Sequence, residues 1–206
     1  MWDSGMIRSK KLIKYGYLEA RVRMPKGIGI WPAFWIIPER EVWPPEIDIF
    51  EYVYNGGPER ENMIHTNVVH QSVSQARSVL YHDPSFSTQW TFWTAPGSTT
   101  DFNDDFHIIS ALWNTDDTVT TYIDGIPIVQ YRYYWKHNDG TDAGLAHVLL
   151  NLAMGGHWGT DNWISTMTTS EQQLEIDYVR IYQRWNAINN GTSVKGMELC
   201  PVGGAC

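Results

Sequence analysis

The sequence has few cysteines, few basic residues and no long hydrophobic run. Its two cysteines, Cys200 and Cys206, fall in the last seven of 206 residues. They could close only a small terminal loop, and both the paired and the free state stay open. Lysine and arginine total 15 against 23 acidic residues, and this formal net charge of −8 argues against a nucleic-acid partner. No uncharged apolar run approaches the ~20 residues of a membrane-spanning helix, so we expect no membrane partner.

Aromatic residues are abundant. Tryptophan and tyrosine occur 11 times each and phenylalanine 6 times. Aromatic faces stack well on the flat C–H faces of sugars, but they also fill cores, and composition alone leaves both interpretations open. A chain of 206 residues corresponds to about one domain and can bury a core without disulfide or metal support.

Short alternating segments dominate the chain and predict strands. In residues 15–24 the apolar side chains Leu18, Ala20, Val22 and Met24 share one face, and charged or tyrosine side chains share the other. We expect further strands at 31–37, 106–113, 118–123, 147–154 and 174–182, with turn residues at 114–117 and 124–125. No sustained helical stripe appears. This pattern favours an all-β antiparallel sandwich or jelly roll.

The segment 46–51 (EIDIFE) carries the chemistry. Strict alternation puts Glu46 and Asp48 on one face but would turn Glu51 into the core, where an unpaired carboxylate costs several kcal/mol. One extra residue in a β-bulge near Ile49 and Phe50 returns Glu51 to the acidic face. Three acids on one face repel each other, which favours a functional over a merely solvated surface.

Two carboxylates held close together are the machinery of retaining glycoside hydrolysis. One attacks the anomeric carbon, and the other protonates the departing oxygen and then activates water. An acid between them, Asp48, could hydrogen-bond the nucleophile and keep the two glutamate pKa values apart.

At these residues the sequence resembles glycoside hydrolase family 16, the laminarinase and lichenase group, whose motif is E-[I/L/V]-D-x-x-E. The six-residue form with the bulge resembles the laminarinase and agarase branches. Further family motifs match in order along the chain: 15–21 (YGYLEAR), 29–35 (GIWPAFW), 106–113 (FHIISALW), 122–125 (YIDG), 151–156 (NLAMGG) and 177–182 (DYVRIY).

The resemblance implies a concanavalin-like jelly roll with a substrate cleft across its concave sheet. Glu46 would be the nucleophile, Asp48 its helper and Glu51 the general acid/base of a retaining endo-β-glucanase acting on β-1,3- or mixed β-1,3/1,4-glucan. Two alternatives remain: the same chemistry on a galactan such as agarose or carrageenan, and a carbohydrate-binding sandwich without turnover. Transglycosylation shares the glycosyl-enzyme intermediate and is not separated from hydrolysis.

The resemblance also implies residues that contact substrate. We expect Trp43 to be a platform on which a sugar stacks. Trp31 is either such a platform or a core residue. We expect Trp113 to line the cleft near the nucleophile. We assign Trp35 to the core. Asn151 and Trp158 resemble the pair that contacts sugar near the cleavage point, with turn structure as the alternative. His65 is expected on the strand beside the acids, where it orients Glu51 or serves structurally.

We expect no cofactor to be required. Seven scattered histidines and a terminal cysteine pair make no zinc site. The Gly16 carbonyl and Asp177 resemble two ligands of a structural Ca²⁺ found in some family members, although calcium needs six or more oxygens.

The ends of the chain give the remaining expectations. We assign residues 1–185 to the catalytic jelly roll and 186–206 to a C-terminal tail. Family members usually carry a few dozen residues before the first matching strand, whereas 14 precede Tyr15, so we expect an N-terminal strand or strands to be lacking and the uncovered edge to favour self-association. Residues 1–5 lack signal-peptide features, but a polysaccharide substrate implies a secreted protein whose precursor carries one.

Overall fold

The structure is a computed structural model that describes residues 4–27, 29–52, 64–70, 73–75, 102–155, 172–184 and 199–201, with only the backbone described at 73–75, 184 and 199–201. Every regular element in these ranges is a β-strand. The described residues contain no helix that could span a membrane.

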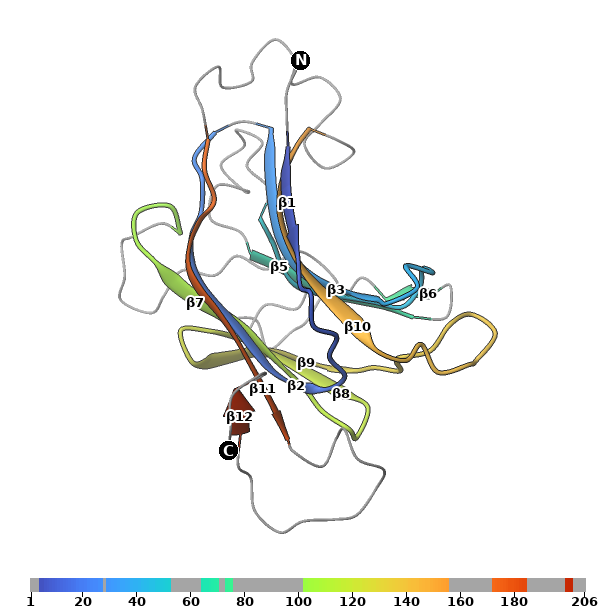
Figure 1. The fold of residues 1–206 in the computed structure, drawn as a ribbon. Coiled ribbons are helices and arrows are strands. Elements are labelled where there is room, and N and C mark those ends of the chain that lie inside the picture. The colour runs from blue at the N-terminus through green and yellow to red at the C-terminus, as the bar shows by residue number, and fades with distance from the viewer. Residues whose placement is uncertain are drawn as a thin grey trace, which may run out of the picture.

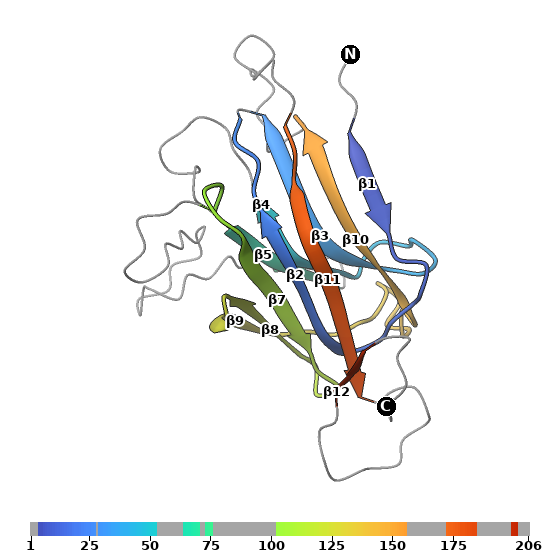
Figure 2. The ribbon, with the colours of Figure 1, turned by 60° about the vertical axis from the view of Figure 1, so that its left-hand side comes forward.

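Within the described ranges, twelve strands form two six-stranded antiparallel sheets (Figures 1 and 2). Sheet A has, in spatial order, β1 (Gly5–Arg8), β10 (Ala146–Met154), β3 (Ile30–Pro38), β4 (Glu46–Tyr52), β5 (Ile64–His70) and β6 (Val73–Gln75). Sheet B has β12 (Leu199–Pro201), β11 (Glu175–Arg184), β2 (Gly16–Arg23), β7 (His107–Trp113), β8 (Thr118–Ile123) and β9 (Ile126–Arg132). The predicted all-β jelly-roll sandwich is confirmed.

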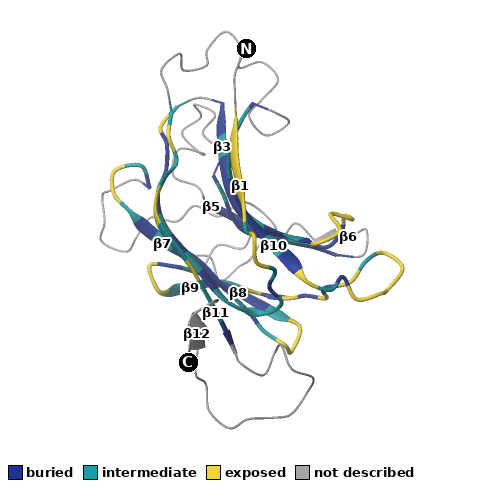
Figure 3. Cartoon of the chain, viewed as in Figure 1, coloured by how far each residue is buried: buried dark blue, intermediate teal, exposed yellow. Residues whose placement is uncertain are grey.

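The hydrophobic core lies between the two sheets (Figure 3). Alternation along β2 places Leu18, Ala20 and Val22 in this core, fully buried as predicted. Phe34 and Phe50 approach each other across β3 and β4 with ring centroids 6.1 Å apart. The face of sheet A that points away from sheet B, here called the outer face, is therefore free to carry polar groups.

Two tyrosines, Tyr131 in β9 and Tyr133 just after it, connect sheet B to the core side of β4 and β5. The Tyr131 hydroxyl hydrogen-bonds the backbone oxygen and Oγ1 of Thr66, each at 2.7 Å. The Tyr133 hydroxyl donates to the backbone oxygen of Glu46 at 3.3 Å. These contacts fix the backbone of the acid-bearing strand from the core side.

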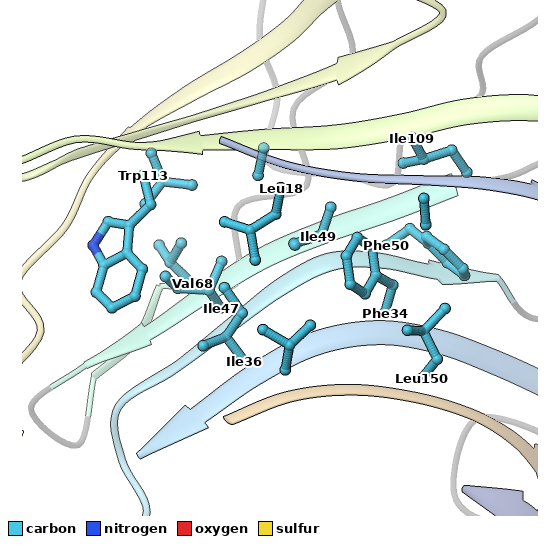
Figure 4. Packing of buried hydrophobic residues seen from close by; sticks show 14 of the residues in the cluster. Leu18, Phe34, Ile36, Ile47, Ile49, Phe50, Val68, Ile109, Trp113 and Leu150 are labelled. Carbon is cyan, nitrogen blue, oxygen red and sulfur yellow. The ribbon is translucent and has the colours of Figure 1, made fainter. Parts of the chain in front are cut away.

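The predicted β-bulge is present in β4. Trp35 of β3 pairs with Asp48 while its neighbour Phe34 pairs with Phe50, so Ile49 is the extra residue. Both Ile49 and Phe50 are fully buried (Figure 4), and Glu51 returns to the outer face opposite Ala33 and His65. Burial of two successive apolar side chains drives the bulge, which in turn sets the direction of Glu51.

Both ends of the chain contribute more to the sheets than the sequence indicated. Residues 5–8, within the segment before Tyr15, form β1 on β10, and Ile13 bridges to Ala146. Within the segment assigned to a tail, Leu199–Pro201 forms β12 on β11. Backbone pairing, rather than an apolar pattern, holds these short strands, which is why periodicity did not indicate them.

Two single-residue deletions test the bulge. Removing Ile49 leaves E-I-D-F-E, which alternates without a bulge and keeps all three acids outward. Removing Ile47 deletes an equally buried isoleucine but turns Glu46 toward the core. We expect ΔIle49 to fold with a loss of about 2–5 kcal/mol in unfolding free energy. ΔIle47 should not give a folded protein at neutral pH, because a buried carboxylate adds its desolvation cost. Urea unfolding measures both, and equal stability of the two variants would contradict the bulge account.

Candidate active site

The outer face of sheet A gathers the three predicted acids on β4. Glu46, Asp48 and Glu51 alternate with the buried residues of the strand, apart from the bulge. Their neighbours on β5 are Val69, Asn67 and His65 in register. The neighbouring positions on β3 carry tryptophans, so apolar rings and polar groups surround the acids.

Glu46 is the first of the three acids. It lies beside Trp43, the exposed side chain that we expect to stack on a sugar. It accepts side-chain hydrogen bonds from Trp43 and from Asp48. Burial, followed by the charge of Glu51, raises the pKa of Glu46 from 4.5 to about 7, and the two hydrogen bonds oppose the rise. The carboxyl therefore changes its charge near neutral pH.

Asp48 lies between the two glutamates and is buried. Burial raises the pKa of Asp48 well above its usual range, and the charges of Glu51 and Glu46 raise it further. Its hydrogen bond with Glu46 favours the proton on Asp48, while a hydrogen bond from Asn67 favours the ionised form. The arrangement is a protonated Asp48 that donates to an ionised Glu46.

Glu51 is held by two ring nitrogens from neighbouring strands. Trp31 Nε1 donates to Glu51 Oε1 at 3.1 Å, and His65 Nδ1 lies 2.8 Å from Glu51 Oε2. The predicted contact between His65 and Glu51 is confirmed. Trp31, which the sequence left between platform and core, points to the outer face as a partner of Glu51.

The three acids therefore differ in environment although they share one strand. Glu46 accepts an O–H from a neighbouring acid, whereas Glu51 is oriented by an indole and an imidazole. Groups of the same type with different surroundings can take different protonation states, which is what a nucleophile and an acid require. In addition to burial, the charge of Glu51 raises the pKa values of both Glu46 and Asp48, so ionisation of either group is disfavoured beside it.

Two further tryptophans, Trp43 and Trp35, lie on or near this face. Trp43 is 56% exposed beside Glu46, a position open to a flat ligand face. Trp35 was assigned to the core, and that prediction is wrong. It lies on the outer face opposite Asp48, where its Nε1 donates to Asn151 Oδ1 at 2.8 Å. The buried neighbours of Trp35 in sequence masked its true face.

Trp113 is the clearest correction among the predicted site residues. Its side chain is 2% exposed and belongs to the core between the sheets (Figure 4). Its ring contacts Trp135 with centroids 4.7 Å apart and Tyr15 at 5.1 Å. It shares the core face of β7 with Ile109 and Ala111, so alternation directs it inward rather than toward the acids.

Asn151 and Trp158 were expected together. Asn151 lies on the outer face of β10 and is held by Trp35, whereas Trp158 lies outside the described residues. The sequence missed Asn67, the hydrogen-bond donor to Asp48. Its signal was available, since Asn67 follows His65 by two residues and strand alternation puts both on one face.

The two residues that suggested calcium do not come together. Gly16 begins β2, whereas Asp177 lies beside the other end of that strand, at the β11 bulge opposite Val22 and Arg21. The Asp177 carboxylate accepts a hydrogen bond from Arg21 Nη1 at 2.7 Å. Within the described part of the chain no cluster of three or more His, Cys, Asp or Glu side chains is arranged to hold a metal.

The fold and the site together define a two-sheet antiparallel jelly-roll sandwich that carries three acids on the outer face of one sheet. The chain belongs to the glycosyl hydrolases family 16, whose family model matches residues 1–180. The segment 46–51, which resembles the family's acidic motif, lies within this range, and its three acids share the outer face of sheet A.

Comparisons with individual proteins agree with this family. The chain is 28% identical over 195 residues to the beta-glucanase of Rhodothermus marinus, covering 86% of this chain and 60% of that protein. It is 29% identical over 183 residues to endo-1,3-1,4-beta-glycanase ExsH of Rhizobium meliloti (strain 1021), covering 88% and 33%. The catalytic domain of an endo-1,3-beta-glucanase (laminarinase) from Thermotoga petrophila RKU-1 superposes with a TM-score of 0.61 at 28% identity, covering 89% and 69%. The chain thus spans less than two thirds of the length of these two curated relatives.

The raised pKa of Glu46 predicts a pH-dependent stability. Because the folded-state pKa is about 7 and the usual value 4.5, the contribution of this group to stability is full below pH 4.5 and is lost as the pH rises through 7. Glu46→Gln removes that loss. We expect the variant to exceed the wild type at pH 8 by on the order of 2–3 kcal/mol in unfolding free energy, with the advantage shrinking toward pH 4.

Urea unfolding of both proteins between pH 4 and 8 measures this difference. Glu39→Gln makes the same replacement at an exposed position of the β3–β4 turn and serves as the control. A Glu46→Gln difference that does not change with pH would show that Glu46 is not held in a destabilised ionised state.

Proposed function

We propose that the chain is a retaining endo-β-glucanase that hydrolyses β-1,3- or mixed β-1,3/1,4-glucan by double displacement. The observation that carries the proposal is the pair Glu46 and Glu51 on one sheet face. Asp48 is hydrogen-bonded to Glu46, whereas Glu51 acts on Asp48 through its charge. Membership in the family and the similarity to a beta-glucanase and an endo-1,3-1,4-beta-glycanase support this substrate class.

The first displacement forms a glycosyl-enzyme. A Glu46 oxygen attacks the anomeric carbon while the glycosidic C–O bond breaks and Glu51 gives its proton to the departing oxygen. Trp31 and His65 fix the two Glu51 oxygens, so the carboxyl is oriented before substrate arrives. The hydrogen bond from Asp48 favours the ionised, attacking form of Glu46 and opposes the rise in its pKa that burial causes.

The second displacement reverses these roles. Glu51, now ionised, takes a proton from water as the water oxygen attacks the anomeric carbon, and the ester bond to Glu46 breaks. The released Glu46 carboxylate again accepts the hydrogen bond of Asp48. A sugar hydroxyl in place of water would give transglycosylation through the same intermediate.

Trp43 and Asn151 supply the substrate-facing surface of this proposal. The exposed Trp43 ring lies next to the nucleophile and suits stacking on a sugar face. Asn151, whose Oδ1 is occupied by Trp35, keeps its amide N–H groups for a sugar hydroxyl.

The galactan alternative finds less support than glucan. A sulfated polymer needs a cationic reader beside the acids. On the outer face of β1, Arg8 pairs with Glu41, so its charge is already compensated. Arg40, the arginine nearest the acid strand in sequence, lies in the exposed β3–β4 turn.

We also propose that the protein acts outside the cell and associates through the edge strand β1. Its substrate would be a polymer too large to enter a cell. All four β1 residues are exposed, and Ile7, which pairs with the core residue Leu150, is 57% exposed. An exposed apolar edge of this kind favours strand-to-strand pairing.

A panel of polymers tests the function. Reducing ends released from laminarin, barley β-glucan, agarose and carrageenan are measured with the wild type, Glu46→Gln and the surface control Glu39→Gln. We expect release from a glucan by the wild type and the control, and a fall of at least about a thousandfold in Glu46→Gln, because the nucleophile is removed.

Other results would overturn parts of the proposal. Near-wild-type activity in Glu46→Gln would refute the nucleophile assignment, and release from agarose or carrageenan alone would move the substrate to galactan. If the folded wild type released no reducing ends from any of the four polymers, a carbohydrate-binding sandwich without turnover would be favoured.

A further inference from the structure

Asn67 occupies a position that the mechanism above does not use. It lies on β5 in register with Asp48 and is 9% exposed. Its side-chain amide donates a hydrogen bond to Asp48, whereas its own Oδ1 is buried and accepts no hydrogen bond from the described residues. Buried polar atoms without a partner are rare in folded proteins and call for an explanation.

The orientation of the Asn67 amide explains why its Oδ1 has no partner. An asparagine can present either its N–H₂ or its carbonyl oxygen to a neighbour. With the carbonyl inward, Asn67 would compete with Glu46 for the proton of Asp48. With the N–H₂ inward, one oxygen of Asp48 is occupied as an acceptor, and the proton is left on the oxygen that faces Glu46. The unpartnered Oδ1 is the cost of this orientation.

We propose that Asn67 is a positioning residue that keeps the proton of Asp48 on the oxygen facing Glu46, so that the nucleophile always has an O–H donor. This inference rests on the proposed function and adds a residue through which that function acts. Asn67 does so through Asp48, without a contact to the reacting atoms.

The groups around Asp48 and Asn67 leave Asp48 as the acid that donates a hydrogen bond to Glu46. Among the described residues, the titratable side chains around Asp48 are Glu46 and Glu51 on β4 and His65 on the same face of β5. From the core side they are Tyr131 of β9 and Tyr133, one residue beyond that strand. His65 is directed to Glu51, and Tyr131 to Thr66. Burial raises the pKa values of both tyrosines, so they stay neutral. Trp35 of β3, opposite Asp48, is directed to Asn151.

Loss of the O–H donor to Glu46 would affect the second displacement. When the Glu46 ester breaks, its bonding electrons return to the carboxylate, and the O–H of Asp48 stabilises the developing charge. The proton of Asp48 is never transferred in either step. A misdirected proton therefore leaves bond formation feasible but slows release of Glu46 from the sugar.

Two variants separate this role from a structural one. Asn67→Asp is isosteric but replaces the N–H donor with an acid, and Asn67→Ala removes the amide. Gln130→Glu makes an amide-to-acid exchange on β9, where Gln130 donates to Thr120 away from the acids, and it is the control.

We expect the acid limb of kcat/KM to move upward by about one pH unit in Asn67→Asp, because Glu46 loses a donor and gains a like charge. On an aryl glucoside with a good leaving group, both Asn67 variants should show a burst followed by turnover slowed roughly ten- to a hundredfold. Gln130→Glu should match the wild type in both measurements.

A folded Asn67→Asp with the wild-type acid limb, or a folded Asn67→Ala that shows no burst, would overturn the proposal. If neither variant folds, carboxyl ¹³C NMR of the labelled wild type decides, and an ionised Asp48 at pH 6 would be equally contradictory. A wild type without glycosidase activity would instead refute the proposed function, which keeps the two failures distinct.

Discussion

Three carboxylates within one strand segment repel each other, and the rest of the outer face depends on how that repulsion is resolved. Asp48 is too deeply buried to ionise beside two other acids, so a proton stays in the trio and becomes a hydrogen bond to Glu46. Glu51 is oriented separately, by ring nitrogens of Trp31 and His65. One repulsive cluster thereby yields two glutamates with different tasks.

The sandwich makes this cluster tolerable because the core fixes the strand that bears it. The extra residue Ile49 and its neighbour Phe50 are both buried, so moving Glu51 off the outer face would expose apolar area. Tyr133 holds the Glu46 backbone from below. The site is thus stabilised by hydrophobic burial on one side of β4, while its own charges oppose the fold. This opposition is typical of functional sites.

The sequence predicted the features that follow from periodicity and electrostatics. Alternation located the core strands, and the cost of a buried Glu51 required the bulge at Ile49. It failed where a side chain's direction depends on tertiary packing. Trp113 was predicted in the cleft but lies in the core, and Trp35 was predicted in the core but lies on the outer face. Tryptophan suits both environments, so only the strand register decides between them. Alternation from His65 could have placed Asn67 on the acidic face, but its hydrogen bond to Asp48 depends on the register between β4 and β5.

The account depends most on Glu46 as the attacking carboxylate. A 2-fluoro-glucosyl oligosaccharide with a dinitrophenyl leaving group should trap the glycosyl-enzyme, since the fluorine slows its breakdown more than the leaving group slows its formation. Mass spectrometry of the intact protein and of its peptides locates the label. The account predicts one label per chain, on Glu46. A label on Glu51, or full hydrolysis of natural glucan by a protein that never forms the adduct, would contradict it.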